Sequence, residues 1–327
     1  MARATLLLPV LALLALACLV LALGAGSAPV SPTTIWEALI GQGEGTHRRI
    51  ILEIRLPRAL AAFVVGGLLG LAGALMQVLL RNPLADPYVL GVSGGAAVGA
   101  LLSMLAGLAG FWLSLNAFVG AIGSMLLVFA IAHGRGGWTP TRLLLTGVVV
   151  AAGWGAVISF LLAVSPEREL RGMLFWLMGD LAHTRGPGWT WLALVVGLLF
   201  AFALARPLNL LARGDLQAQA LGVAVGPLRL AIYFAASLLT AAAVTVGGTI
   251  GFVGLVIPHM IRLIAGADHR LLVPAAVLLG GSLLTAADAL ARVIIAPQQL
   301  PVGVITALIG VPIFLVLLHR GPRRHQR

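Results

Sequence analysis

Runs of eighteen or more mostly apolar residues recur along almost the whole chain. A helix of that length can cross a hydrocarbon core roughly 30 Å thick, and a segment in lipid must satisfy its own backbone hydrogen bonds. The sequence therefore predicts an all-α integral membrane protein with about ten transmembrane helices. The expected spans are residues 6–24, 57–80, 91–109, 111–132, 143–164, 189–205, 228–249, 252–265, 271–295 and 303–318.

The segments between these runs are short, and the longest, at about residues 25–56, is too small for a soluble domain. We therefore expect one transmembrane domain over residues 1–327. Charged residues make up 9% of the chain, whereas soluble domains carry about 25%. The first run also has features of a signal peptide, with Arg3 ahead of it and small residues near Ala28, but its apolar core is long for one.

Several kinds of chemistry are excluded by composition. All 21 basic residues are arginine, so the chain lacks the lysine that a phosphate-binding GxxxxGK[ST] loop or a Schiff base requires. Cys18 is the single cysteine, and the seven histidines show neither an HExxH motif nor paired metal-ligand spacing. The sequence predicts no catalytic residues, no metal site and no bound cofactor, so the chain is not expected to be an enzyme.

The arginines give the expected orientation. Their formal excess of +11 does not indicate nucleic-acid binding, because they sit at the ends of apolar runs. Ten spans divide the loops into two sets, which hold 13 and 8 arginines. Cytoplasmic loops carry the excess of positive residues, so the larger set, together with both termini, is predicted to be cytoplasmic.

One arginine cluster opposes that rule. Arg48, Arg49, Arg55 and Arg58 lie just before the second span, on the predicted outer side. Either they anchor the chain to lipid headgroups, or they form an exposed docking surface for an acidic partner. Arg292 lies near the same side, where it can pair with Asp288 four residues earlier or join the cluster.

Glycines and prolines mark two irregular segments. Two prolines four residues apart forbid a regular helix in residues 81–87, and glycines interrupt residues 247–251. We expect such backbone to be packed inside the protein, since lipid does not tolerate it. His259, after Pro258, is either a hydrogen-bonded structural residue or a proton relay. The helically spaced glycines at 66–73 predict close helix packing.

The longest inner connection, residues 206–226, contains a short predicted helix at 214–222. Asp215 near its start favours the helix dipole, and Gly222 can close it. Docking of a partner and a solvated connector are both compatible with this pattern. Few ionisable residues fall within the spans, which favours an external energy source over the alternative, an ion-coupled secondary transporter.

These segments together resemble a known family, the FecCD-like permease subunits of type II ABC importers for cobalamin, haem and ferric siderophores. The resemblance covers about residues 33–318. It is carried by the motifs Arg55-Leu-Pro-Arg58, Asn82-Pro-Leu-Ala-Asp-Pro87, Leu90-Gly-Val-Ser-Gly94, Gly248-Thr-Ile-Gly-Phe-Val-Gly-Leu-Val-Ile-Pro-His259, Asp288-Ala-Leu-Ala-Arg292 and Leu300-Pro-Val-Gly-Val-Ile-Thr-Ala-Leu-Ile-Gly-Val-Pro312.

The resemblance implies a homodimer in the bacterial inner membrane, with the pathway between the two copies. It implies a cytoplasmic ATPase dimer that binds the ATP, and a periplasmic substrate-binding protein. It also implies roles for three groups of residues: docking of the binding protein by Arg55, Arg58 and Arg292; ATPase coupling by Arg213, Gly214, Asp215, Ala218, Leu221 and Gly222; and an inner gate near Thr139, Thr141 and Thr146. The substrate stays open between iron complexes, haem included, and cobalamin.

Overall fold

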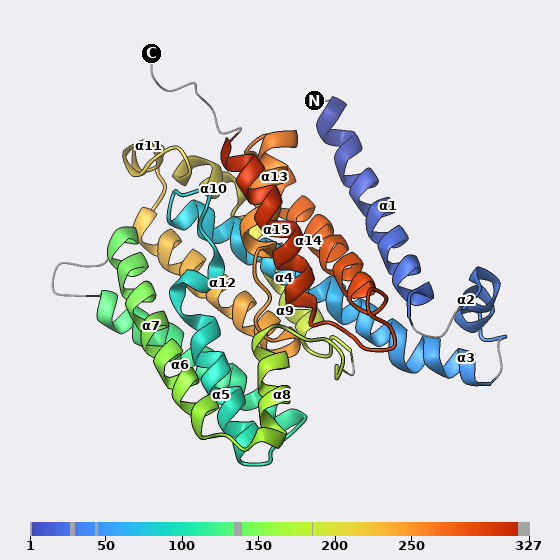
Figure 1. The fold of residues 1–327 in the computed structure, drawn as a ribbon. Helices are drawn as coiled ribbons and strands as arrows, with labels where there is room; N and C mark the ends of the chain where they lie inside the picture. Colours follow the sequence, from blue (N-terminus) through green and yellow to red (C-terminus); the bar gives the residue numbers. More distant parts are fainter. Residues whose placement is uncertain (1, 27–29, 43–44, 134–138, 185, 320–327) are drawn as a thin grey trace.

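The computed structural model describes all residues except 1, 27–29, 43–44, 134–138, 185 and 320–327, and the regular structure in the described part is helical (Figure 1). Arg135, Arg185 and the C-terminal arginines of the orientation argument lie outside the described residues. Within the described residues, six helices have the length and composition of membrane spans: α1 (Ala2–Gly24), α4 (Leu56–Leu79), α6 (Phe111–Ala132), α7 (Pro140–Val164), α12 (Val225–Gly247) and α14 (His269–Ala291).

The other expected spans are shorter or broken. The helices α9 (Thr190–Ala203) and α10 (Ala205–Leu211) form one apolar unit with a 62° bend between them. Three shorter apolar helices are α5 (Val92–Leu105), α13 (Val253–Ala265) and α15 (Val302–His319). Each of the ten predicted spans thus coincides with a helix or with this bent pair, which confirms the predicted fold class.

Short helices connect the spans. On the chain between α1 and α4 lie α2 (Pro32–Leu39), α3 (Thr46–Arg49) and the π-helix η1 (Ile50–Arg55), which runs on into α4. The 3₁₀ turn η2 (Pro87–Leu90) precedes α5, α8 (Glu167–Leu177) follows α7, and α11 (Asp215–Ala220) precedes α12. The beginning of α1 and the end of α15 lie at the same end of the bundle as α11 (Figure 1).

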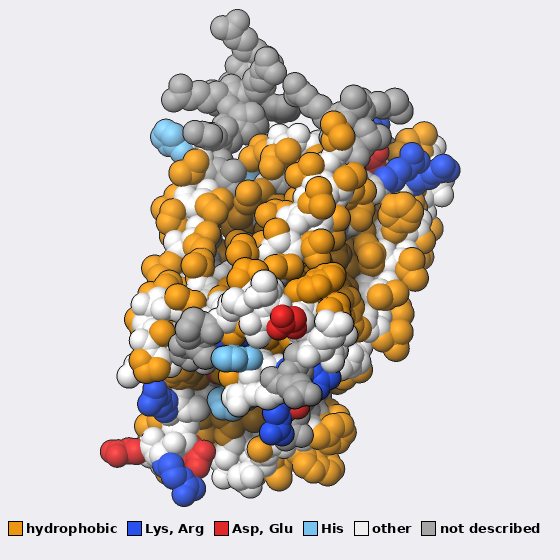
Figure 2. All heavy atoms as spheres, turned by 90° about the vertical axis from the view of Figure 1, so that its right-hand side faces the viewer, with side chains coloured by type: hydrophobic (Ala, Val, Ile, Leu, Met, Phe, Trp, Pro, Cys, Tyr) orange, Lys and Arg blue, Asp and Glu red, His pale blue; other side chains and the backbone are white. Residues whose placement is uncertain are grey.

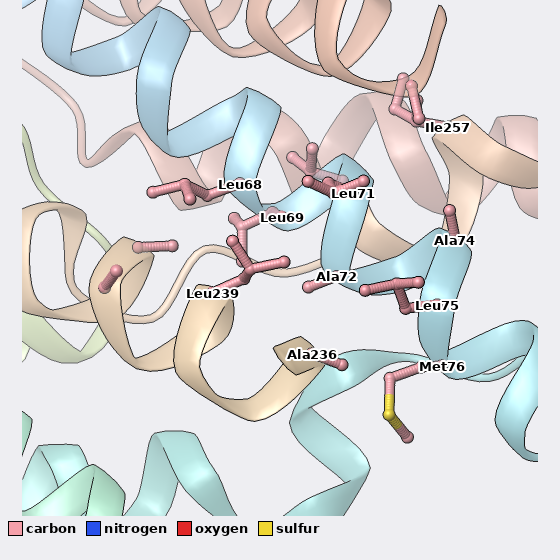
Figure 3. Packing of buried hydrophobic residues seen from close by; sticks show 14 of the residues in the cluster. Leu68, Leu69, Leu71, Ala72, Ala74, Leu75, Met76, Ala236, Leu239 and Ile257 are labelled. Atoms are coloured by element: carbon pink, nitrogen blue, oxygen red, sulfur yellow. The ribbon is translucent and has the colours of Figure 1, made fainter. Parts of the chain in front are cut away.

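Helix α4 forms the centre of the bundle. Its apolar window is 89% buried, whereas that of α7 is 11% buried. Leu69 and Met76 of α4 belong to the main hydrophobic cluster, together with Leu239 of α12 and Ile257 of α13 (Figure 3). A helix that is apolar on all sides is stable where other helices surround it, and α4 meets α9, α12, α13 and α14 on its different faces.

The glycines of α4 allow its neighbours to approach closely. Gly66, Gly70 and Gly73 lie one or two turns apart on one face. A Cβ atom at any of them would overlap a backbone carbonyl oxygen of α14 or α13. Small residues permit such backbone contact between membrane helices. The close packing predicted from these glycines is therefore confirmed.

The two irregular segments meet inside the bundle, next to α4. Residues 82–91 and 248–252 interrupt the helices at Asn82-Pro83 and at Gly248, whose φ is +67°. The Tyr88 hydroxyl accepts a hydrogen bond from the Ile250 N–H at 3.1 Å, so the segments bind each other. Gln77 of α4 donates to the Leu255 carbonyl at 3.0 Å. As expected, this irregular backbone is packed within protein.

The surface has the pattern of a membrane protein. Figure 2 shows hydrophobic side chains across the middle of one face, with charged side chains gathered towards its two ends. Lipid solvates the apolar middle, and the charged side chains remain in water or among headgroups. This distribution agrees with the span positions given by the helices.

The glycine contacts generate a stability prediction. In Gly73→Ala, the added methyl group would meet the backbone of Gly254, and we expect overpacking to cost about 1–3 kcal/mol. Thermal unfolding of the purified protein in detergent measures this as a lower melting temperature. The matched control is Gly123→Ala in α6, where nothing lies within 4 Å of the new Cβ. An equal effect of the two substitutions would contradict the packing argument.

Candidate functional site

The first candidate site lies at the end of the bundle opposite α11, where Arg58 lies in the first turn of α4. Its guanidinium forms a bidentate pair with Asp288 of α14, in which Nη2 donates to Oδ1 at 2.7 Å and Nε donates to Oδ2 at 3.0 Å. Its Nη1 donates to Gln299 Oε1 at 2.7 Å. Arg292 shares the same carboxylate, with its Nε 3.2 Å from Asp288 Oδ2. One carboxylate therefore serves two arginines from two helices.

Arg55 and Arg292 also bind the end of α1. Arg55 Nη1 donates to the carbonyls of Leu23 at 2.7 Å and Gly24 at 3.0 Å. Arg292 donates to the carbonyls of Ala22 at 2.9 Å and Ala25 at 3.0 Å. The last carbonyls of a helix lack partners within it and carry a partial negative charge. The two arginines thus cap α1 and fasten it to α4 and α14.

These contacts correct the expectation of an exposed cluster. Arg55, Arg58 and Arg292 lie together, as predicted, but each is only 4–5% exposed. The sequence showed their charge and their position but not the carbonyls at the end of α1, which lie more than thirty residues away along the chain from Arg55. The pair of Arg58 with Asp288, 230 residues apart, was likewise missed. Sequence spacing carries no signal for either contact.

Arg48 and Arg49 differ from this buried set. Both belong to the short helix α3 and are exposed, and the Arg49 side chain lies 3.6 Å from Glu53 at the surface. Exposed pairs of this kind contribute little to stability. Their charge is therefore available to lipid headgroups or to a partner, and both readings stay open. His259 is half-buried, and its Nδ1 has no hydrogen-bond partner among the described residues.

The second candidate site is α11, which coincides with the predicted inner helix. Gly222, at φ +80°, follows its C-terminus, and the N–H groups of Gly222 and Val223 bind the carbonyls of Gln219 and Ala218. This is the Schellman arrangement that left-handed glycine favours. Gly222 therefore closes the helix, as the sequence indicated.

Two leucines at α11, one within the helix and one directly after it, are exposed. Leu216 is 83% exposed and Leu221 is 64% exposed, whereas Ala218 is fully buried. Large apolar side chains this exposed on a small polar helix mark an interaction surface. Leu216 was not among the coupling residues predicted from the sequence. Ala218 was, but it packs inward rather than towards a partner. Arg213, just before the helix, is exposed. Gly214 is the N-cap of α11, with φ +127°.

Asp215, the first residue of α11, joins the helix to the bundle. Its carboxylate pairs with Arg229 of α12, at 2.7 and 2.8 Å from Nη2. It also pairs with Arg81, which lies two residues beyond the last residue of α4. Asp215 belongs to the predicted coupling group, but neither arginine was predicted as its partner.

The predicted gate residues lie at the beginning of α7. Thr139 caps this helix by accepting a hydrogen bond from the Arg142 N–H at 3.2 Å. Thr146 follows seven residues later, which is about two turns of helix, and so lies on nearly the same face as Thr139. Thr141 points away from that face. Thr139 and Thr141 are exposed and Thr146 is half-buried. Gly147 packs against the Val89 backbone, which brings η2 beside this part of α7.

Comparison with known proteins shows the family to which this architecture belongs. Residues 13–320 match the model of the FecCD transport family. The chain belongs to the FecCD family. It is 40% identical to the hemin transport system permease protein HmuU of Yersinia pestis, with 94% of each chain covered. It is 39% identical to the vitamin B12 import system permease protein BtuC of Escherichia coli, over 96% of this chain and 94% of that protein.

Two further matches concern an uncharacterised relative and a solved structure. The ABC transporter permease protein YvrB of Bacillus subtilis is 41% identical over 87% of this chain and 83% of its own length. A metal-chelate type ABC transporter in an inward-facing conformation superposes with a TM-score of 0.85, at 32% identity, over 96% of this chain and 98% of that chain. The fold of this chain is therefore that of a type II ABC importer permease.

Membership of the FecCD family settles the class of the protein. The chain is a multi-pass ABC importer permease for substrates of the vitamin B12, haem or siderophore type. Permeases of this family are not enzymes and carry no cofactor, and the ATP is bound by the partner ATPase.

The buried ion pairs generate a second prediction. Asp288→Asn would leave Arg58 and Arg292 buried without their carboxylate, and breaking a buried pair in this way costs about 3–5 kcal/mol. Glu53→Gln is the matched control, because the Arg49–Glu53 pair is exposed and its loss should cost at most about 1 kcal/mol. Melting temperatures in detergent compare the two. A tolerated Asp288→Asn would show that the arginines do not depend on this carboxylate.

Proposed function

We propose that two copies of this chain form the membrane pathway of a binding-protein-dependent importer, which carries a bulky metal chelate across the bacterial inner membrane. A separate ATPase supplies the energy. The observation that carries the proposal is the nearly full-length FecCD match, with permeases for haemin and vitamin B12 among the relatives. One permease domain over residues 1–327 performs this role, and its two-fold symmetric dimer places the pathway on the axis.

In this proposal, the end of the bundle that carries α11 faces the cytoplasm, and so do both termini. The arginine excess of the loops supports this orientation. The exposed Leu216 and Leu221 then insert into the ATPase, while Arg213, Gly214, Asp215, Ala218 and Gly222 shape and hold α11. The buried Ala218 acts from the inner side of the helix, by seating it on the bundle.

The binding protein docks at the opposite end, above Arg55, Arg58 and Arg292. Because these side chains are buried, they act on the binding protein first through the electrostatic field of their positive charges. Arg58 and Arg292 share the single carboxylate of Asp288, which leaves an excess of positive charge there. Such a field draws acidic groups to the surface and orients them. Direct contact with a partner carboxylate would require it to displace carbonyls of α1.

The inner gate is proposed at the beginning of α7, where Thr139, Thr141 and Thr146 lie. Helix α7 is the least buried of the long spans in one copy. A helix with so much free surface suits a position beside the pathway or the second copy. The proposed substrate is a metal chelate. It is either an iron complex, with haem included, or cobalamin.

Transport by the reconstituted complex tests the proposed function. Vesicles that contain this chain with its ATPase, supplied with the cognate binding protein, should accumulate one of cyanocobalamin, haemin or a ferric hydroxamate when ATP is present. Binding of the same three compounds to the purified binding protein identifies the candidate in advance. Accumulation by this chain alone, driven by an ion gradient, would establish the secondary-transporter alternative instead.

Salt dependence tests the docking role without any substitution. If the field of the arginine cluster steers the binding protein, its association rate with the reconstituted complex should fall steeply as ionic strength rises, because salt screens the attraction. Stopped-flow or surface-binding measurements give this rate. A rate that is independent of salt would remove the cluster from the docking step. Charge reversal is unsuitable here, since these buried arginines also hold α1.

A further inference from the structure

The contact between α11 and the bundle depends on one carboxylate. Asp215 binds Arg229 of α12 through both of its oxygens, at 2.7 and 2.8 Å. It binds Arg81 at the end of α4 through Oδ1. The three side chains are only 14–37% exposed, so their charges are partly shielded from water. Charge-assisted hydrogen bonds of this kind are stronger and more directional than neutral ones.

The backbone at Arg81 supports a specific role for its side chain. Its φ is +47°, in the left-handed region that closes many helices. Glycine normally occupies such a position, because a side chain there costs about 1–2 kcal/mol. An arginine is retained in this conformation where its guanidinium reaches Asp215. The strain and the ion pair coincide at the junction between α4 and the irregular segment 82–91.

That segment leads from the ion pair to α7. It is held by two side-chain turns, in which Asn82 Oδ1 accepts from the Leu84 N–H at 2.9 Å and Asp86 Oδ1 accepts from the Tyr88 N–H at 2.8 Å. Its far end, η2, packs on α7, where a Cβ atom at Gly147 would overlap the Val89 carbonyl oxygen. A displacement of Arg81 can therefore reach the beginning of α7 through short, stiff connections.

We propose that Asp215 is a positioning residue that clamps α11 to Arg81 and Arg229, so that a displacement of α11 moves α4, α12 and, through residues 82–91, the gate end of α7 together. This rests on the proposed function, in which the ATPase moves α11. To the proposed function the clamp adds a specific route by which the movement of α11 reaches the membrane helices. Without the clamp, α11 would still bind the ATPase through Leu216 and Leu221, but no ion pair would pass its movement on to α4 and α12.

The decisive measurement is the amount of substrate transported per ATP hydrolysed. In the reconstituted complex, Asp215→Asn should keep ATPase association and ATP hydrolysis, while uptake per ATP falls at least about fivefold, the lower end of typical coupling between sites. The transported compound is whichever of cyanocobalamin, haemin or ferric hydroxamate the unmodified complex accumulates. Asp215→Glu, which keeps the charge, should recover much of the ratio.

Two further variants separate the clamp from a general loss of structure. Arg81→Gln acts from α4 without altering α11, and it should lower the same ratio. Combining it with Asp215→Asn should add little, because Asp215→Asn already removes the ion pair with Arg81. Asp268→Asn is the matched control. Asp268 lies beside α10 and caps α14 through its Oδ1, which an asparagine retains, so the ratio should be unchanged.

The outcomes distinguish the clamp from the function on which it rests. An unchanged ratio in Asp215→Asn, or loss of ATPase association in that variant, would overturn the clamp, since the residue would then be dispensable or part of the contact surface. Leu216→Asp tests the surface itself. If that variant still binds the ATPase and transports normally, α11 is not the ATPase contact and the proposed function of this helix fails.

Discussion

Close backbone contact around α4 is the constraint on which the rest of this structure depends. Lipid tails are as apolar as leucine, so burying apolar side chains between membrane helices gains little, and association must come from packing and polar contacts. Gly66, Gly70 and Gly73 provide that packing on one face of α4, against α13 and α14. With α9 and α12 on its other sides, α4 is enclosed along its whole length.

A central helix fixed in this way sets the positions of both candidate sites. Arg58 lies in its first turn and Arg81 just after its end, so the two are separated by roughly 35 Å at 1.5 Å per residue. At each end, one aspartate serves the α4 arginine and a second arginine from another helix. Asp288 joins Arg58 to Arg292, and Asp215 joins Arg81 to Arg229.

Local patterns explain which features were predictable from the sequence. Apolar length gave the ten spans, the spacing of glycines gave the packing face of α4, and the position of Gly222 gave the end of α11. Each of these depends on residues close together in the chain. The burial of Arg55, Arg58 and Arg292 was not predictable, because Arg55 and Arg292 bind the end of α1, and Arg58 binds side chains more than 200 residues away in the chain. Leu216 was missed because its exposure is set by how α11 sits on the bundle.

The two arginine–aspartate groups differ in a way that suits different tasks. Around Asp288 the side chains are almost completely buried, so breaking the pairs is costly and the end of α4 opposite α11 is held in one arrangement. Around Asp215 they are partly exposed, but one carboxylate still joins α11 both to α12 and to Arg81 just beyond α4. Helix α4 is thus held by a buried group at the end opposite α11 and is joined at its other end to the one element that the ATPase moves in the proposed mechanism, so a displacement of α11 would enter the bundle at that end of α4.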